Sequence, residues 1–162
     1  MQYRAYLDIE TTGLSPLESE LTVIGIYREN GNDSRVMQIV GEDISSASLI
    51  TAIGNITKLY TYNGSRFDLP FIKAKLNVDL TECCPHEDLM YACWRKNLKG
   101  GLKSVERQLG IARELTGIDG WAAVQLWWNY VNDGDRDALA TLLKYNEEDV
   151  LNLRVLRERL GV

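Results

Sequence analysis

Apolar and β-branched residues are concentrated in short runs along the first part of the chain. Runs of this length, bounded by turn-forming residues, are typical of β-strands. They predict strands over Tyr3–Asp8, Leu21–Tyr27, Arg35–Val40 and Lys58–Tyr62. The segment Arg28–Ser34 is rich in Asn, Asp and Gly, so it predicts a hairpin-type turn. We therefore expect the first three strands to form an antiparallel meander.

Helical patterns follow these strands, and the last two have apolar residues spaced near 3.6 positions. The patterns predict helices over Ser46–Gly54, Asp68–Leu76, Asp88–Lys96, Asp119–Asn132 and Asp137–Leu160. The first of these crosses over to the fourth strand, which makes that strand parallel within the sheet. The order of elements predicts an α/β domain with three layers. Because the last helix runs nearly to the C-terminus, we expect residues 1–162 to form a single domain.

The composition is that of a globular protein, with 45% apolar and 25% charged residues. No apolar stretch approaches the roughly 20 residues that span a bilayer, and the N-terminus lacks the basic and apolar pattern of a leader. We therefore expect neither membrane insertion nor a signal peptide. Cys83, Cys84 and Cys93 are odd in number and two are adjacent, which argues against a disulfide framework. This cysteine usage favours a cytoplasmic protein.

Asp8 and Glu10 end the first predicted strand, just before the polar turn Thr11–Leu14. Residues two apart on a strand project to the same face, so these carboxylates lie side by side. They repel each other and add nothing to a core, whereas a divalent cation with oxygen ligands makes the pair favourable. The pattern indicates half of a metal site for phosphoryl transfer. Two solvated acids at a strand end are the alternative interpretation.

Asp68 stands at the predicted start of a helix, after the fourth strand. An acid in this position also serves as a plain N-cap or first-turn residue. Ligands of open α/β sheets bind beyond the carboxyl ends of the strands, which is the edge toward which Glu10 points. Its position therefore makes Asp68 a second candidate for the same site.

Asp149 lies on the inward face of the last predicted helix, where a carboxylate is costly unless it is paired or bound to metal. Tyr145 lies one turn earlier on the same face, either as core packing or over the same site. The neighbouring acids Glu147 and Glu148 are expected to face solvent.

Three motifs occur in order along the chain: Asp-x-Glu-Thr-Thr-Gly-Leu from Asp8, Tyr-Asn-x-x-x-Phe-Asp ending at Asp68, and Tyr-x-x-x-Asp ending at Asp149. Together they resemble the three exonuclease motifs of the DEDD superfamily, in its tyrosine subclass. The chain is similar to ribonuclease H-like domains related to the proofreading exonuclease of family B DNA polymerases. The resemblance runs from Tyr3 to about Leu156. It implies a ribonuclease H-like α/β/α fold with a mixed sheet.

The resemblance also implies a 3′–5′ exonuclease that acts on single-stranded DNA or RNA ends. By the family pattern, Asp8, Glu10, Asp68 and Asp149 hold two Mg²⁺ or Mn²⁺ ions, and Tyr145 orients the attacking water. The pattern further implies contacts to the last nucleotides from Thr11, Thr12, Leu14, Asn63 and Phe67. Lys103 lies near the proposed substrate edge and is a candidate phosphate contact.

The net charge of −5 neither supports nor excludes a nucleic-acid partner. If four of the 23 acids bind metal, the remaining 19 nearly balance the 18 bases. An enzyme that binds a strand end transiently tolerates this balance, whereas a tight non-specific binder usually has a basic face.

Several alternatives remain open at this point. The cysteines with His86 are a zinc candidate, although their spacing does not match a closed tetrahedral site. Trp121, Val124, Trp128 and Val131 fall at helical spacing and favour core packing, which leaves Trp127 as the better candidate for an exposed base-stacking residue. The alternative functions are a catalytically silent nucleic-acid-binding or partner-docking domain, a structure-specific endonuclease, and a nuclease of very short oligonucleotides.

Overall fold

The computed structural model describes residues 2–162. Its strands are β1 (Tyr3–Thr11), β2 (Leu21–Glu29), β3 (Ser34–Val40), β4 (Ile56–Thr61) and β5 (His86–Asp88). Its helices are the 3₁₀ helix η1 (Gly41–Asp43) and α1 (Ser46–Ala52), α2 (Asp68–Leu76), α3 (Leu80–Cys83), α4 (Leu89–Arg95), α5 (Leu102–Leu109), α6 (Gly120–Asp133) and α7 (Arg136–Leu160).

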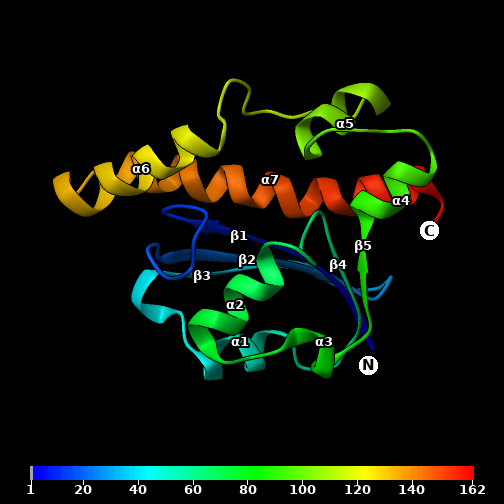
Figure 1. The fold of residues 1–162 in the computed structure, drawn as a ribbon, viewed down its shortest axis with the longest axis horizontal. Helices are drawn as coiled ribbons and strands as arrows, with labels where there is room; N and C mark the ends of the chain where they lie inside the picture. Colours follow the sequence, from blue (N-terminus) through cyan, green and yellow to red (C-terminus); the bar gives the residue numbers. More distant parts are fainter. Residues whose placement is uncertain (1) are drawn as a thin grey trace.

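The five strands form one mixed sheet in the order β3-β2-β1-β4-β5 (Figure 1). β1, β2 and β3 pair in antiparallel fashion, whereas β4 lies parallel to β1 and β5 lies parallel to β4. Helices α1, α2 and α3 lie on one side of the sheet, and α4 to α7 lie on the other (Figure 1). The predicted three-layer α/β fold, with a meander followed by parallel strands, is confirmed.

Side chains of β1 alternate between the two faces, as the two-residue period of a strand requires. Leu7 and Ile9 pack in the core beneath α1 and α2. Tyr6 packs on the opposite face, against residues of α7. Asp8 and Glu10 follow Tyr6 at two-residue steps and therefore share its face. The final helix thus crosses the face of the sheet that carries both carboxylates.

Helix α7 begins where Asp135 caps it, through a hydrogen bond from the Ala138 amide to the Asp135 carboxylate at 3.0 Å. The helix buries a continuous stripe that includes Leu142, Tyr145, Asp149 and other residues. The apolar members of this stripe pack on α6, on the sheet and on residues of α4 and α5, so α7 is held in place along its length. The inward position predicted for Tyr145 and Asp149 is confirmed.

The sequence patterns do not predict four of the elements. η1 and β5 have three residues each and α3 has four, so these three are too short to show a repeating pattern. The fourth element, α5, begins at Leu102 directly after Gly100 and Gly101, and these glycines favour a loop in the sequence. Within residues 2–162, no helix has the length and apolar character needed to cross a membrane.

The prediction for the tryptophans of α6 is wrong. Trp127 is buried, at 7% exposure, whereas Trp121 is 72% exposed. Ala123 and Trp127 lie one turn apart and form the face that packs against Leu142 and Tyr145 of α7. The packing of α6 on α7 therefore determines which face of α6 is buried.

Candidate functional site

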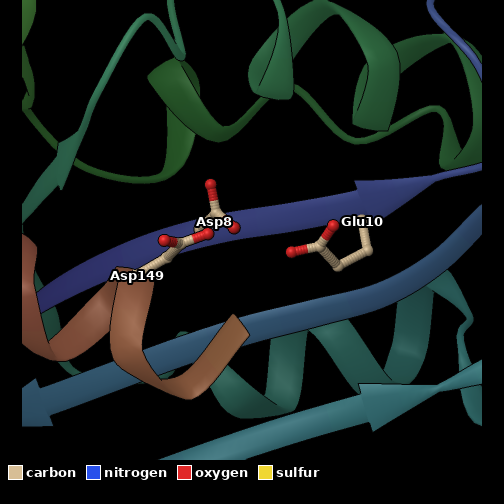
Figure 2. Close-up of side chains that lie close together, drawn as sticks. All are labelled: Asp8, Glu10 and Asp149. Atoms are coloured by element: carbon tan, nitrogen blue, oxygen red, sulfur yellow. The ribbon is translucent and has the colours of Figure 1, made fainter. Parts of the chain in front are cut away.

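Three carboxylates meet on the α7 side of the sheet, at the end of β1. One oxygen each from Asp8, Glu10 and Asp149 lie within 4.8 Å of one another. Figure 2 shows Asp8 and Glu10 projecting from the same strand, with Asp149 reaching toward Asp8 from α7. The predicted side-by-side pair on β1 is therefore present, and the third acid joins it from a segment that is remote in the sequence.

Asn146 positions Asp8 within this cluster. Its buried side-chain amide donates to the Asp8 carbonyl and to Asp8 Oδ2, both at 3.2 Å. Its own oxygen accepts from Gln38 Nε2 at 3.0 Å, which fixes the orientation of the amide. Gly25 pairs with Asp8 across the sheet, and a Cβ at this position would lie 2.1 Å from Asn146 Oδ1. The close approach of Asn146 to the strand therefore requires glycine there.

Burial, together with repulsion between like charges, raises the pKa values of the carboxyl groups of Asp8 and Glu10. The pKa of Asp8 lies well above its ordinary value because of burial and the negative charge of Asp149. The pKa of Glu10 is raised for the same two reasons. Glu10 Oε1 is shielded from solvent and has no hydrogen-bond partner among the described residues. Without a cation, burial and mutual repulsion therefore disfavour the charged forms of these carboxyl groups.

Arg113 is the cation that balances Asp149. It lies in the loop between α5 and α6, and its guanidinium donates to Asp149 Oδ1 at 2.5 Å. The same guanidinium binds both oxygens of Glu106, at 2.9 and 2.7 Å. Burial raises the pKa of Asp149, while the charge of Arg113 acts in the opposite direction. Arg113 therefore ties α5 and its loop to the acidic end of the site.

Asp68 lies at the start of α2, as predicted, but outside the group of three. Its Oδ2 accepts a hydrogen bond from the Ile9 amide at 3.1 Å, which holds it beside β1. Burial raises its pKa to about 7. The loop before it is fixed by Asp88, whose carboxylate accepts from the amides of Asn63 at 2.8 Å and Ser65 at 3.1 Å.

Tyr145 and Lys103 lie together beside the acids. Lys103 Nζ donates to the Tyr145 hydroxyl at 2.6 Å and lies 4.4 Å from the centre of its ring. Burial and the negative charge of Asp149 raise the pKa of Tyr145 well above its usual value. The phenol therefore keeps its proton at neutral pH and remains a hydrogen-bond donor.

A cavity of about 900 Å³ opens over this group of residues. The acids Asp8, Glu10, Asp68 and Asp149 line it together with Tyr145. Every residue predicted to contact substrate lines the same cavity: Thr11, Thr12, Leu14, Asn63, Phe67 and Lys103. The structure thus gathers at one place all of the residues that the motifs singled out, while their roles remain predictions.

The family model of the RNase H superfamily matches residues 5–161, which is nearly the whole chain. The chain belongs to the RNase H superfamily. A curated relative is the uncharacterized protein YprB of Bacillus subtilis strain 168, which is 29% identical over 163 residues. This alignment covers 91% of the chain but only 39% of YprB, so the chain spans about two fifths of that relative.

Solved structures that share this fold include a DNA polymerase and the protein NrnC. The family B DNA polymerase of Pyrobaculum calidifontis superposes with a TM-score of 0.73 and 16% identity, covering 99% of this chain and 25% of the polymerase. NrnC of Brucella melitensis bound to pGG superposes with a TM-score of 0.62 and 20% identity, covering 98% of this chain and 71% of NrnC. Another NrnC structure contains bound Mg²⁺. The predicted resemblance is confirmed at the level of superfamily and fold.

The carboxylate group fits the divalent metal that RNase H-like nucleases use. Its donors are all oxygens, which is the preference of hard cations. Glu10 Oε1 lacks any partner in the part of the chain that the structure describes, and burial beside like charges raises the pKa values of Asp8 and Glu10, which disfavours their charged forms when no cation is bound. A cation at this position satisfies both the oxygen and the charge.

The structure corrects one prediction and gives no support to another. Glu148 is buried rather than solvated, because its carboxylate accepts from the amides of Glu114 and Leu115, each at 3.1 Å. Among the described residues, the cysteines do not gather with His86 as metal ligands: His86 bonds to Thr61 Oγ1 at 2.8 Å.

Sequence reasoning missed Arg113, Asn146 and Asp88. Asn146 has a detectable signal, because it precedes Asp149 by three residues on α7 and so lies on the same face. In the sequence, Asp88 has the position of an ordinary helix cap. It also fills this role in the structure, because its carboxylate accepts a hydrogen bond from the Met90 amide at 3.0 Å. Arg113 has no signal at all, since it stands in a loop whose path depends on tertiary packing.

Proposed function

We propose that this chain is a metal-dependent 3′–5′ exonuclease that hydrolyses phosphodiester bonds at the 3′ end of single-stranded DNA or RNA. The observation that carries the proposal is the group formed by Asp8, Glu10 and Asp149, within a cavity that Tyr145 and Lys103 also line. The fold that it shares with a DNA polymerase and with NrnC supports the proposal. A catalytically silent binding domain has no use for acids whose mutual repulsion destabilises the fold.

In this proposal Asp8, Glu10 and Asp149 hold the metal, and Asp68 is the fourth acid of the site. When bound, two Mg²⁺ or Mn²⁺ ions stabilise negative charge on the phosphate and lower the pKa of the attacking water. The water oxygen attacks phosphorus and the bond to the 3′-oxygen breaks. A nucleoside 5′-monophosphate leaves, and the shortened strand ends in a 3′-hydroxyl that has gained the proton.

Tyr145 orients the attacking water in this scheme. Lys103 donates to the phenol oxygen, so the phenol's own proton is free to bond to the water or to the phosphate. Because its pKa is raised, Tyr145 acts as a donor and not as a general base. Lys103 holds this donor in place and brings positive charge close to the scissile phosphate.

Replacing Tyr145 with Phe is expected to lower kcat by about 100-fold, a typical effect of removing one hydrogen-bond donor from a reaction centre. Metal affinity, measured by isothermal titration with Mn²⁺, should stay unchanged because the hydroxyl coordinates nothing. Tyr130→Phe is the control, since Tyr130 packs beside Trp127 on α6. A metal affinity that falls with the rate would show that Tyr145 belongs to the metal site itself.

Hydrolysis of very short oligonucleotides is a second candidate. The volume of the cavity, about 900 Å³, lies within the range of small-molecule pockets, and NrnC, which shares this fold, has been solved with pGG. Comparing the kcat/KM for pGG with that for a long strand decides between the two. A dinucleotide preferred over long strands would favour the second candidate.

The direct test of the proposal uses end-labelled single-stranded DNA, single-stranded RNA and mismatched duplex DNA in Mg²⁺, in Mn²⁺ and in EDTA. The proposal expects single strands to be shortened with either metal and to survive in EDTA. Strands that persist with both metals would contradict it. We also propose a reducing cytoplasmic location, which fits the free thiols of Cys83, Cys84 and Cys93.

A further inference from the structure

Trp121 is a large apolar side chain left open to solvent inside the cavity. It is 72% exposed, and Leu14, which also lines the cavity, is 85% exposed. Burying a tryptophan is strongly favourable, so a chain that leaves one open in a cavity gives up stability there. Exposed apolar surface within a pocket marks the position of a ligand group.

The local structure of α6 holds Trp121 in this position. Asp119 caps the helix by accepting from the Ala122 amide at 2.8 Å, which places Trp121 in the first turn. Ala123 and Trp127 face the core, and a position two residues before Ala123 points to the opposite side of a helix. Val124, three residues after Trp121, lines the cavity beside it. Trp121 is therefore exposed because α6 turns the opposite face, with Ala123 and Trp127, toward the core.

The cavity lining offers groups for both parts of a nucleotide. Its apolar side chains include Leu14, Trp121 and Val124. The four acids also line it, and Lys103 is the one cation among the lining residues that the structure describes. A nucleotide has a flat apolar base at one end and a phosphate at the other. With the phosphate at the acids and their metal, the base is left for the apolar lining, to which the exposed Trp121 belongs.

We propose that Trp121 stacks on one of the last two bases of the single-stranded substrate. The inference deepens the proposed function, on which it rests for the nature of the ligand. Indole rings stack on every base, so the contact holds the strand without selecting its sequence. It gives α6 a direct part in binding, in addition to its packing on α7.

Binding is measured by fluorescence anisotropy of a short 5′-labelled oligodeoxyadenylate with a free 3′ end, in Ca²⁺, with hydrolysis checked on the same samples. Trp121→Ala is expected to weaken binding by about 5- to 150-fold, the range measured for a base-stacking aromatic residue. Trp121→Phe should restore much of the affinity because it keeps a ring. Trp94→Ala is the matched control, since Trp94 is an exposed tryptophan of α4 that packs at the edge of Tyr91.

The stacked base is identified with strands that lack a base at the last or the penultimate position. At one of these positions, removing the base should weaken the binding of wild type as much as Trp121→Ala does. Removing the same base should not weaken the binding of the Trp121→Ala variant any further. Losses that add at both positions, or a Trp121→Ala variant that binds like wild type, would overturn the inference. A melting temperature equal to that of wild type shows that the variant is folded.

The same experiment separates this inference from the proposed function. If wild type degrades strands in Mg²⁺ while Trp121→Ala binds normally, the inference fails and the exonuclease proposal stands. If binding depends on Trp121 but no hydrolysis occurs in Mg²⁺, the exonuclease proposal fails and the inference stands. A wild-type protein that binds no single strand overturns both.

Discussion

Asn in place of Asp8 is expected to abolish metal-dependent hydrolysis while stabilising the metal-free protein. Asp8 is central to the acidic group, and a neutral amide is a poor ligand for a hard cation. Losing about 4 kcal/mol of metal-derived stabilisation of the transition state corresponds to about 1,000-fold in rate. The same change removes one of the like charges crowded beside Asp149. The melting temperature in EDTA should therefore rise, by about 2–4 °C for each kcal/mol of relieved repulsion.

The gain in stability should depend on pH in a defined direction. Asp8 titrates near pH 4 when unfolded, whereas burial and the charge of Asp149 raise its pKa well above that in the folded protein. Between these pH values the folded state binds more protons, so wild-type stability falls as pH rises. Asp68, with a folded pKa of about 7, contributes a decline of its own between about pH 4 and about pH 7. Asp8→Asn should show a shallower decline.

The measurement is thermal unfolding of both proteins in EDTA and in Mg²⁺ across this pH range. Mg²⁺ at 100 times its Kd should stabilise the wild-type protein by about 2.7 kcal/mol and so raise its melting temperature. The melting temperature of Asp8→Asn should not change with Mg²⁺. Asp43→Asn, at an exposed position, is the matched control and should leave activity and both melting curves unchanged. A destabilised Asp8→Asn protein in EDTA would contradict the repulsion argument.

Met in place of Arg113 is expected to destabilise the protein by about 3–5 kcal/mol, the usual cost of removing one partner from a buried ion pair. The Arg113 side chain is 7% exposed and pairs with Glu106 and Asp149, whose side chains are 2% and 8% exposed. Met keeps much of the packing volume, so the loss reports on charge. Activity should fall as well, because Asp149 loses the group that fixes its position.

Urea unfolding of Arg113→Met and Arg154→Met separates burial from charge. Arg154 also pairs with two acids, Glu29 and Glu158, but its side chain is 39% exposed. Its removal should cost less than about 1 kcal/mol, as is typical of exposed pairs. Arg113→Lys, which keeps the charge but loses the bidentate geometry, should fall between wild type and Arg113→Met. Equal effects of Arg113→Met and Arg154→Met would show that the Arg113 network is not a structural tie.

The parts of the fold that the sequence predicted are those with a strong local pattern. The meander followed from apolar runs and from the turn that contains Asn30, Gly31, Asn32 and Asp33, and the two long helices followed from the spacing of their apolar residues. The acids could be predicted because Asp8 and Glu10 are anomalous on a strand and Asp149 is anomalous on an inward helix face. A polar residue at a position where the strand or helix pattern predicts an apolar one is the clearest sign of a functional residue in a sequence.

The errors arise where tertiary packing decides. Trp121 and Trp127 belong to two different faces of α6, and the packing of Ala123 and Trp127 with Leu142 and Tyr145 of α7 determines which face is buried. Glu148 is held inside by two amides of a loop that has no periodic pattern. Arg113 pairs with Asp149, which is 36 residues away in the sequence, and local sequence patterns do not predict contacts over such a separation.

The most direct test of the central claim compares three forms of one single-stranded DNA in Mg²⁺: a linear strand with a 3′-hydroxyl, the same strand with a 3′-phosphate, and a covalently closed circle. We expect Leu14 and the backbone of Thr11 and Thr12 to close off the site beyond the terminal nucleotide. The free 3′ end should then lose mononucleotides one after another, while the 3′-phosphate blocks the reaction and the circle survives. Circles cut as fast as linear strands would contradict the enclosed 3′ terminus and favour an endonuclease.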